Sequence, residues 1–137
     1  MAQPLTLHED RLFPADARLR EIARRIYTTT RGLPIVSPHG HTDPAWFATD
    51  APFADATSLL LTPDHYLYRM LYSQGVALEA LGLRAGPDSG QAVDPREAWR
   101  VFARHSHLFR GTPSSLWLDQ VFAEVFGLHQ RLSAETA

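Results

Sequence analysis

A single short stretch with strand character, residues 33–37 (LPIVS), constrains the fold most, because the other patterns in the sequence are helical. Ile35 and Val36 would point to opposite faces of a sheet, and because both are apolar we expect the strand to be buried. A strand must pair with another strand, so a lone one suggests a piece of a larger fold. Residues 133–137 (SAETA) look like the start of a helix that is cut off, which suggests the same.

Helical periodicity accounts for most of the remaining sequence. From Asp16 to about Thr29, apolar residues recur at intervals of three and four. This pattern predicts an amphipathic helix that is capped by Asp16 and ends at Arg31-Gly32, with the glycine in the left-handed conformation. Four more helices are expected, because a proline at the first helical position suits a helix start. Their starts are Asp43-Pro44, Thr62-Pro63-Asp64, Asp94-Pro95 and Thr112-Pro113.

The same patterns predict which side chains face inward and where helices end. The inward residues of the last three helices are expected to be Leu67, Met70, Leu71, Trp99, Phe102, Ala103, Leu116, Trp117, Val121 and Val125. Gly75 and Gly127 are expected to end two of these helices. Residues 84–93 are rich in Gly, Pro, Ser and Asp, so we expect a surface loop there.

We therefore predict a mainly α-helical chain that forms a single unit over residues 1–137. An irregular arm covers residues 1–14, and the first helix and the strand cover residues 15–44. A helical part covers residues 45–137 and is expected to be truncated at its C-terminus.

Composition excludes several classes of function. The net charge is −2 with both signs interspersed, so no basic surface for nucleic acid or for a membrane is expected. The absence of cysteine excludes disulfides, thiolate metal sites and a cysteine nucleophile. Neither a secretory signal nor a membrane-spanning stretch is visible. We expect a cytoplasmic protein.

Two histidines come directly after the strand. Residues i and i+2 of an extended chain point to the same side, so His39 and His41 can present their imidazoles to one point. Two neutral imidazoles at this spacing can bind a divalent metal if a carboxylate and a water or substrate complete the site. Pairs of this kind also occur by chance and are mostly solvated, so the spacing alone leaves both interpretations open.

Other histidines carry weaker signals. His65-Tyr66 lies in the first turn of an expected helix, where side chains and backbone N–H groups can meet an anionic ligand, but both could equally be surface or packing residues. His105 and His107 lie at a helix end, so we expect them to interact with the helix C-terminus or to pack in a turn.

Four stretches of the sequence together carry a likeness to a known family. They are residues 4–10 (PLTLHED), residues 39–44 (HGHTDP), Asp64-His65-Tyr66 continuing to Arg69-Met70, and residues 109–113 (FRGTP). These stretches resemble the uronate isomerase (glucuronate isomerase) family of the amidohydrolase superfamily. The resemblance extends over essentially the whole chain. Family members are several hundred residues long, so this chain resembles only their amino-terminal part.

The resemblance implies a distorted (β/α)₈ TIM-type barrel, of which this chain would supply the first strand and a helical insertion. It implies interconversion of D-glucuronate with D-fructuronate and of D-galacturonate with D-tagaturonate. His39 and His41 would be metal ligands, with zinc as the expected ion. Tyr66 would be catalytic, and His65, Tyr66 and Arg69 would bind the hexuronate. The remaining ligands and the carboxylate-binding arginines would lie beyond Ala137, so the 137 residues alone are expected to be inactive.

Two alternatives remain open at the level of sequence. One is a metal-dependent amidohydrolase on the same scaffold, against which the helical stretches after His41 argue. The other is a non-catalytic helical domain that acts in protein interaction. Homo-oligomerisation is also left open.

Overall fold

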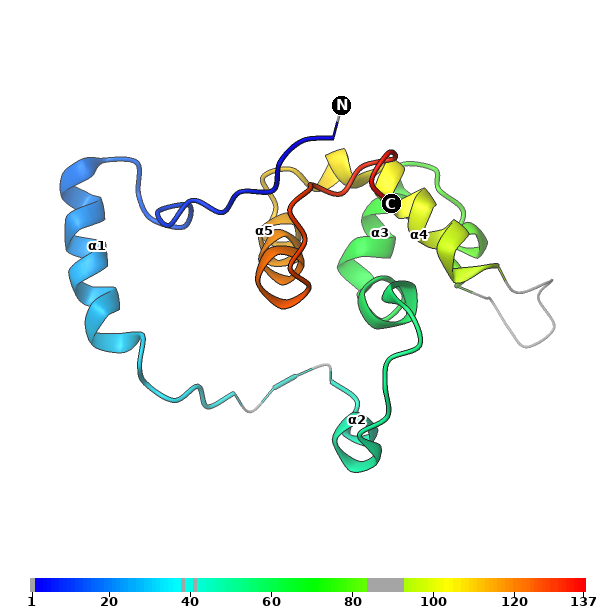
Figure 1. The fold of residues 1–137 in the computed structure, drawn as a ribbon, viewed down its shortest axis with the longest axis horizontal. Coiled ribbons are helices and arrows are strands. Elements are labelled where there is room, and N and C mark those ends of the chain that lie inside the picture. Colours follow the sequence, from blue (N-terminus) through cyan, green and yellow to red (C-terminus); the bar gives the residue numbers. More distant parts are fainter. Residues whose placement is uncertain (1, 38, 41, 84–92) are drawn as a thin grey trace. The chain divides into compact units, whose positions relative to one another are not determined.

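The computed structural model describes residues 2–37, 39–40, 42–83 and 93–137, and it is mainly helical as predicted (Figure 1). The chain divides into two compact units: the smaller is Leu7–Ala51, and the larger joins Met1–Thr6 to Pro52–Ala137. The division therefore falls after residue 51, and it groups the first six residues with the second half of the chain. The loop expected at residues 84–93 lies, apart from Val93, outside the described residues.

Two helices form the regular part of the smaller unit. α1 (Ala17–Thr30) begins where the sequence predicts, because the Asp16 side chain accepts the Leu19 N–H at 2.9 Å. α2 (Pro44–Thr49) begins after Asp43, whose side chain accepts the Ala45 N–H at 2.9 Å. The left-handed conformation expected at Gly32 is wrong, since Arg31 ends α1 in a right-handed conformation and the glycine has no positive φ.

The apolar face of α1 remains exposed in the described part of the smaller unit. Leu19, Ile22, Ile26 and Tyr27 are all exposed, and the helix buries no residue. Phe13 reaches this face, with its ring centroid 5.8 Å from that of Tyr27 in an edge-to-face contact. The periodic pattern thus predicted the helix correctly, but its apolar face is not buried.

The predicted strand at residues 33–37 does not form. Within the described chain, the structure assigns no strand there and only an isolated bridge between Pro4 and Gln130 elsewhere. Ile35 is 94% exposed and Val36 is 89% exposed, so the predicted burial is also wrong for this chain. The physical reason is the absence of a partner, because an extended segment becomes a strand only when its N–H and C=O groups pair with a neighbour.

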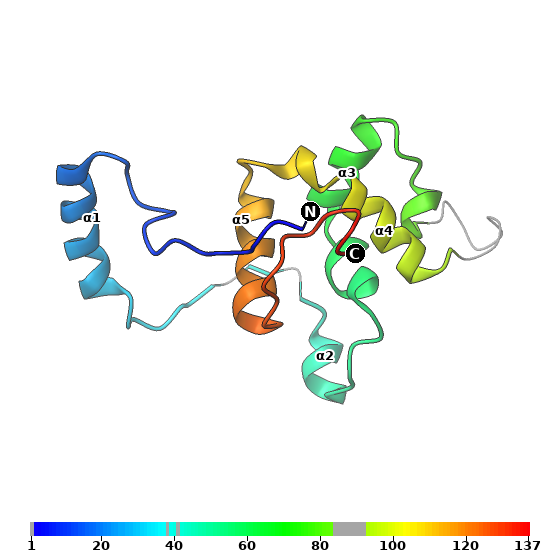
Figure 2. The ribbon, with the colours of Figure 1, turned by 45° about the horizontal axis from the view of Figure 1, so that its top comes forward.

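The larger unit consists of short helical elements. They are η1 (Thr57–Leu61), α3 (His65–Ser73), η2 (Glu79–Leu81), α4 (Pro95–Arg104), η3 (Ser106–Phe109), α5 (Pro113–Gln120) and η4 (Val121–Val125) (Figures 1 and 2). α4 packs against η1, η2 and η3 and so lies at the centre of the unit. The apolar core residues are Leu5, Leu60, Leu61, Leu67, Leu71, Leu81, Ala98, Phe102, Ala103, Phe109, Leu118 and Phe122.

Aromatic contacts and one buried hydroxyl tie these elements to α4. The Phe102 ring makes edge-to-face contacts with Trp99 and Phe109, at centroid distances of 5.3 and 5.6 Å. Thr57 is buried in η1, and its hydroxyl donates to the Pro95 carbonyl at 2.6 Å, so the polar group is satisfied. The predicted inward face of α4 is confirmed for Phe102 and Ala103, while Trp99 is half-buried.

α5 buries a different face from the one predicted. Leu118 and Phe122 are buried, whereas Leu116, Trp117 and Val125 are exposed. Leu118 and Phe122 are four residues apart and so share one side of a helix. After Gln120 the helix widens into the π-helical turn η4, which alters the spacing on which a simple periodicity depends. Gly127 follows with φ +64°, which confirms it as the left-handed end of this helix.

Residues 3–5 and residues 129–131 lie side by side in the larger unit. The Leu5 N–H donates to the His129 carbonyl and the Arg131 N–H donates to the Gln3 carbonyl, both at 2.9 Å. Leu5 is buried by this arrangement, so the expected irregular arm is anchored at its start. Residues 133–137 form a turn rather than the start of a helix. The Thr136 N–H donates to the Ser133 carbonyl at 3.2 Å, and its hydroxyl donates to the Arg131 carbonyl at 2.7 Å.

Candidate active site

The predicted metal ligands lie in the smaller unit, just before α2. His39 is exposed, and its carbonyl accepts the Ser37 hydroxyl at 2.7 Å. His41 lies outside the described residues, so the convergence of the two imidazoles stays a prediction. A Cβ atom placed on Gly40 would meet nothing within 4 Å. In the part of the chain that the structure describes, no three metal-binding side chains gather at one point.

The predicted substrate-binding residues lie in the larger unit, on α3. The helix begins at His65, because the Asp64 side chain accepts the Tyr66 N–H at 2.8 Å. The predicted start, Thr62-Pro63-Asp64, is confirmed at Asp64, which caps the helix, but Pro63 is not its first residue and Thr62 instead ends η1. The Asp64 cap accounts for the position of the two aromatic residues after it.

His65, Tyr66 and Arg69 share one side of α3. Arg69 follows Tyr66 by three residues and His65 by four, which places all three on one face. Leu67 and Leu71 lie on the opposite face, where they are buried as predicted. The His65 and Tyr66 rings lie against each other with centroids 4.2 Å apart. Tyr66 is 66% exposed.

His105 and His107 behave as the sequence predicts. The His105 Nδ1 lies 2.8 Å from the Val101 carbonyl, and the His107 Nδ1 lies 3.2 Å from the Arg104 carbonyl. Both rings therefore bond to the carboxyl end of α4, and they stack on each other at a centroid distance of 6.3 Å.

A cleft of about 650 Å³ in the larger unit was not predicted. Its walls come from the C-terminal end of α4, η3, α5 and residues 131–135, and none of the predicted site residues lines it. Arg110 and Gly111 of the FRGTP stretch do line it, but no spacing within that stretch indicates a cleft.

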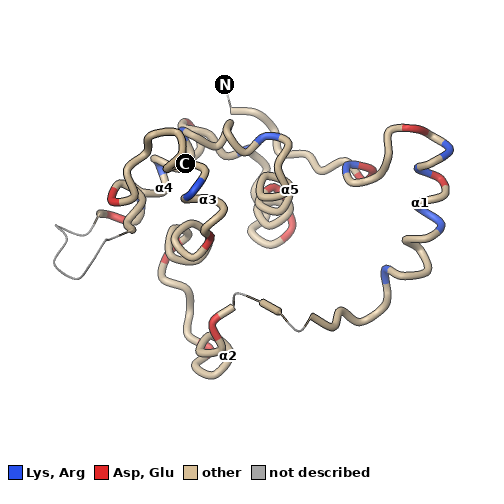
Figure 3. Tube along the Cα trace, turned by 180° about the vertical axis from the view of Figure 1, so that it is seen from behind, with Lys and Arg blue, Asp and Glu red and all other residues tan. Residues whose placement is uncertain are grey.

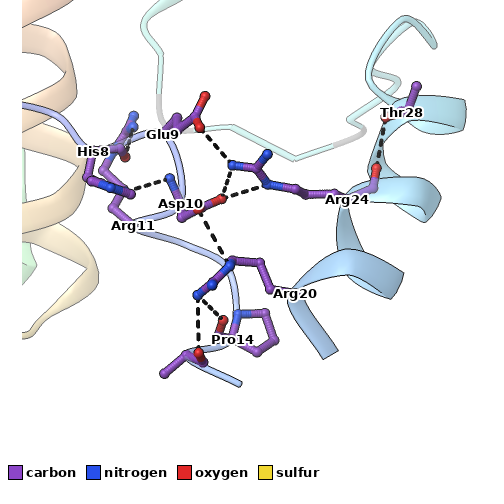
Figure 4. Close-up of polar contacts among 9 residues, drawn as sticks. His8, Glu9, Asp10, Arg11, Pro14, Arg20, Arg24 and Thr28 are labelled. Atoms are coloured by element: carbon purple, nitrogen blue, oxygen red, sulfur yellow. Dashed lines mark hydrogen bonds and ion pairs between the residues drawn. The ribbon is translucent and has the colours of Figure 1, made fainter. Parts of the chain in front are cut away.

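The last two residues of the PLTLHED stretch, Glu9 and Asp10, have a structural role in the smaller unit. Arg24 of α1 donates to the Glu9 and Asp10 carboxylates, and Arg20 lies 3.6 Å from Asp10 (Figure 4). These hydrogen bonds raise the pKa of Arg24 above its ordinary value, and the bond to Asp10 has a larger effect than the bond to Glu9. α1 carries four arginines and one glutamate, so its basic side chains can pair with acidic residues that precede the helix (Figure 3).

Comparison with known proteins assigns the class. Residues 13–137 match the family model described as glucuronate isomerase, so the chain belongs to the glucuronate isomerase family. The resemblance seen in the sequence is confirmed. The chain is 67% identical over its full length to the uronate isomerase of Phenylobacterium zucineum (strain HLK1), and it covers 28% of that protein. The uronate isomerase of Rhizorhabdus wittichii is 68% identical over 99% of the chain, which again covers 28% of that protein.

The fold has a counterpart in a solved structure. The crystal structure of glucuronate isomerase from Caulobacter crescentus matches 98% of this chain with a TM-score of 0.89 and 63% sequence identity. The chain covers 28% of that structure. It therefore spans less than a third of the length of the relatives that it matches.

Proposed function

We propose that this chain is the amino-terminal part of a hexuronate isomerase. The complete enzyme would interconvert D-glucuronate with D-fructuronate and D-galacturonate with D-tagaturonate. One observation carries the proposal: over its whole length the chain is 67% identical to a protein named uronate isomerase, while covering 28% of it. Family membership favours this activity over hydrolysis of amides and over a non-catalytic role in protein interaction.

In the complete enzyme, residues 33–37 would be the first strand of a distorted (β/α)₈ barrel of the amidohydrolase type. The exposure of Ile35 and Val36 supports this, because a barrel strand is buried on both faces and both residues are apolar. His39 and His41 would then lie at the carboxyl end of that strand, where the catalytic sites of such barrels are built.

His39 and His41 would provide two ligands for a divalent metal, with zinc as the proposed ion. The imidazole chemistry fits, but two ligands do not complete a site, so the others would come from outside these 137 residues. A bound ion would polarise or orient oxygens of the substrate.

The residues of α3 would act on the substrate directly. Isomerisation moves a proton between C2 and C1 of the open-chain sugar through an enediol, which requires a base, a proton donor and stabilisation of the developing charge. Tyr66, an exposed residue, would hydrogen-bond a sugar hydroxyl or relay a proton. His65 and Arg69 share its side of the helix and would bind the hexuronate.

The test uses a full-length family member that carries this sequence, assayed for isomerisation of D-glucuronate. We expect His39→Asn to abolish most of the activity and Tyr66→Phe to lower kcat by roughly a hundredfold, as is typical when a proton-transfer group is lost. Tyr72→Phe is the matched control, because Tyr72 is an exposed tyrosine on the same helix. Unchanged turnover for both His39→Asn and Tyr66→Phe would reject these roles.

Two properties of the chain stay predictions. The 137 residues alone should not isomerise hexuronates, since the proposed site is incomplete. The protein is expected to be cytoplasmic; within the described residues, no helix is both long enough and apolar enough to cross a membrane.

A further inference from the structure

The arginines that line the cleft of the larger unit outnumber the acidic residues that line it. Arg104, Arg110 and Arg131 contribute three positive charges, against two negative charges from Asp119 and Glu135. These residues come from the end of α4, the segment after η3, α5 and the last residues of the chain, so several parts of the larger unit build one concave surface.

The two carboxylates already have partners. Arg131 forms an ion pair with Asp119 at 2.5 Å, and the Glu135 carboxylate accepts the Ser133 hydroxyl at 2.6 Å. Neither carboxylate is paired with Arg104 or Arg110. Within the described part of the chain, the side chains of Arg104 and Arg110 make no hydrogen bond and no ion pair. The cleft thus presents two guanidinium groups whose donors are available.

We infer that this cleft binds a small organic anion with a carboxylate or phosphate group, held by Arg104 and Arg110. A guanidinium presents a planar fork of N–H donors that matches the oxygens of such an anion. The Ser106 and Ser115 side chains also line the cleft and provide polar neighbours. A volume of about 650 Å³ accommodates a metabolite-sized molecule. The inference does not depend on the proposed isomerase activity, because no residue assigned to that activity lines the cleft.

The test is calorimetric titration of the 137-residue chain with citrate and with inorganic phosphate, using glycerol as an uncharged control. We expect citrate to bind and glycerol not to bind. Arg104→Gln and Arg110→Gln should each weaken citrate binding roughly three- to tenfold, the range for charge-assisted bonds in a solvent-accessible site. High salt should weaken it as well.

Arg25→Gln is the matched control, since Arg25 is an exposed arginine of α1 in the other unit. It removes the same charge and should leave citrate binding unchanged. Amide chemical shifts of Ser106, Gly111 and Ser115 should move on titration, which would locate the anion in the cleft. The inference is overturned if neither anion binds, if Arg25→Gln weakens binding as much as the cleft variants do, or if the shifts move elsewhere.

Discussion

Asp10 is the acceptor on which two arginines of α1 converge. Its carboxylate accepts the Nε of Arg24 at 2.8 Å, and the Nε of Arg20 lies 3.6 Å away (Figure 4). Exposed ion pairs are individually weak, but a shared acceptor lets one carboxylate hold two side chains. These contacts connect residues 8–10 to a helix that buries none of its own residues, so they are a main local support for that segment.

Asp10→Asn should lower the melting temperature of the chain slightly, because it removes the charge that both arginines share. The decrease should shrink in high salt, which screens such pairs. Thermal unfolding followed by circular dichroism at low and high salt measures it. Glu21→Gln removes one negative charge from α1 at an exposed position and should have a smaller effect. Equal effects of the two variants would contradict the role given to Asp10.

Glu135 is an acid whose titration the fold perturbs. The Ser133 hydroxyl bonds its carboxylate, and a backbone N–H adds to this, so the pKa of Glu135 is lowered below its ordinary value. A lowered pKa in the folded state means that the charged form is favoured by folding. The associated stability is present above the unfolded-state pKa and is lost as the pH falls through the folded-state pKa.

Removing the hydroxyl should reverse this shift. We expect Ser133→Ala to raise the pKa of Glu135 towards its ordinary value and to reduce the loss of stability on acidification. An NMR titration of the Glu135 carboxyl carbon measures the pKa. Ser73→Ala is the control, because the Ser73 hydroxyl donates to the Met70 carbonyl on α3. A pKa that does not change in Ser133→Ala would show that the hydroxyl is not the cause.

At the scale of the element, helix starts and buried faces behave differently. Asp16, Asp43, Asp94 and Thr112 each accept an N–H of the first turn of the helix that follows. Each of these bonds joins residues two or three apart, so it depends on little outside the helix. The buried face of α5 depends instead on what packs against it, and there the periodicity selected the wrong residues.

Leu116 and Leu118 provide a matched pair on α5. Leu118 is 4% exposed and Leu116 is 41% exposed. We expect Leu118→Ala to lower the free energy of unfolding by roughly 2–5 kcal/mol, the usual cost of truncating a buried leucine. Leu116→Ala should cost less than about 1 kcal/mol, as for a surface substitution. Urea denaturation measures both, and a larger effect at Leu116 would contradict the observed face of the helix.

At the scale of the whole molecule, the chain leaves apolar residues exposed in both units. Ile35 and Val36 are exposed in the smaller unit, as are the apolar residues of α1, and Trp117 and Val125 are exposed in the larger one. In relatives of which this chain covers 28%, most of the protein lies outside the matched region. Exposed apolar residues in such numbers favour association with another surface.

We expect the 137-residue chain to self-associate as its concentration rises. Sedimentation velocity over a concentration series measures this. Substituting both exposed residues of the unpaired segment, Ile35→Asn with Val36→Asn, should reduce association. Thr28→Asn with Thr29→Asn is the control, because it places the same residues at exposed positions of α1 that are already polar. A chain that stays monomeric at every concentration would contradict the prediction.

Some features of the candidate sites depend on residues close in sequence, and others depend on residues far apart in sequence. The face that His65, Tyr66 and Arg69 share follows from their spacing on a helix whose cap, Asp64, is adjacent in sequence. The cleft around Arg104 and Arg110 could not be predicted, because its walls include Gln3 and residues 131–135, which are far from α4 in sequence. Likewise, the spacing of His39 and His41 alone could not decide whether His39 binds a metal.

The sequence by itself determined the family, the helical character of the chain and the positions at which most helices begin. These follow from short-range hydrogen bonds and from residue types that can be recognised along the chain. Only the tertiary structure decided which face of α5 is buried, that Gln3 and Leu5 pair with residues 129–131, and that residues 33–37 form no strand within the described residues. Burial and strand formation depend on partners that the local pattern does not specify.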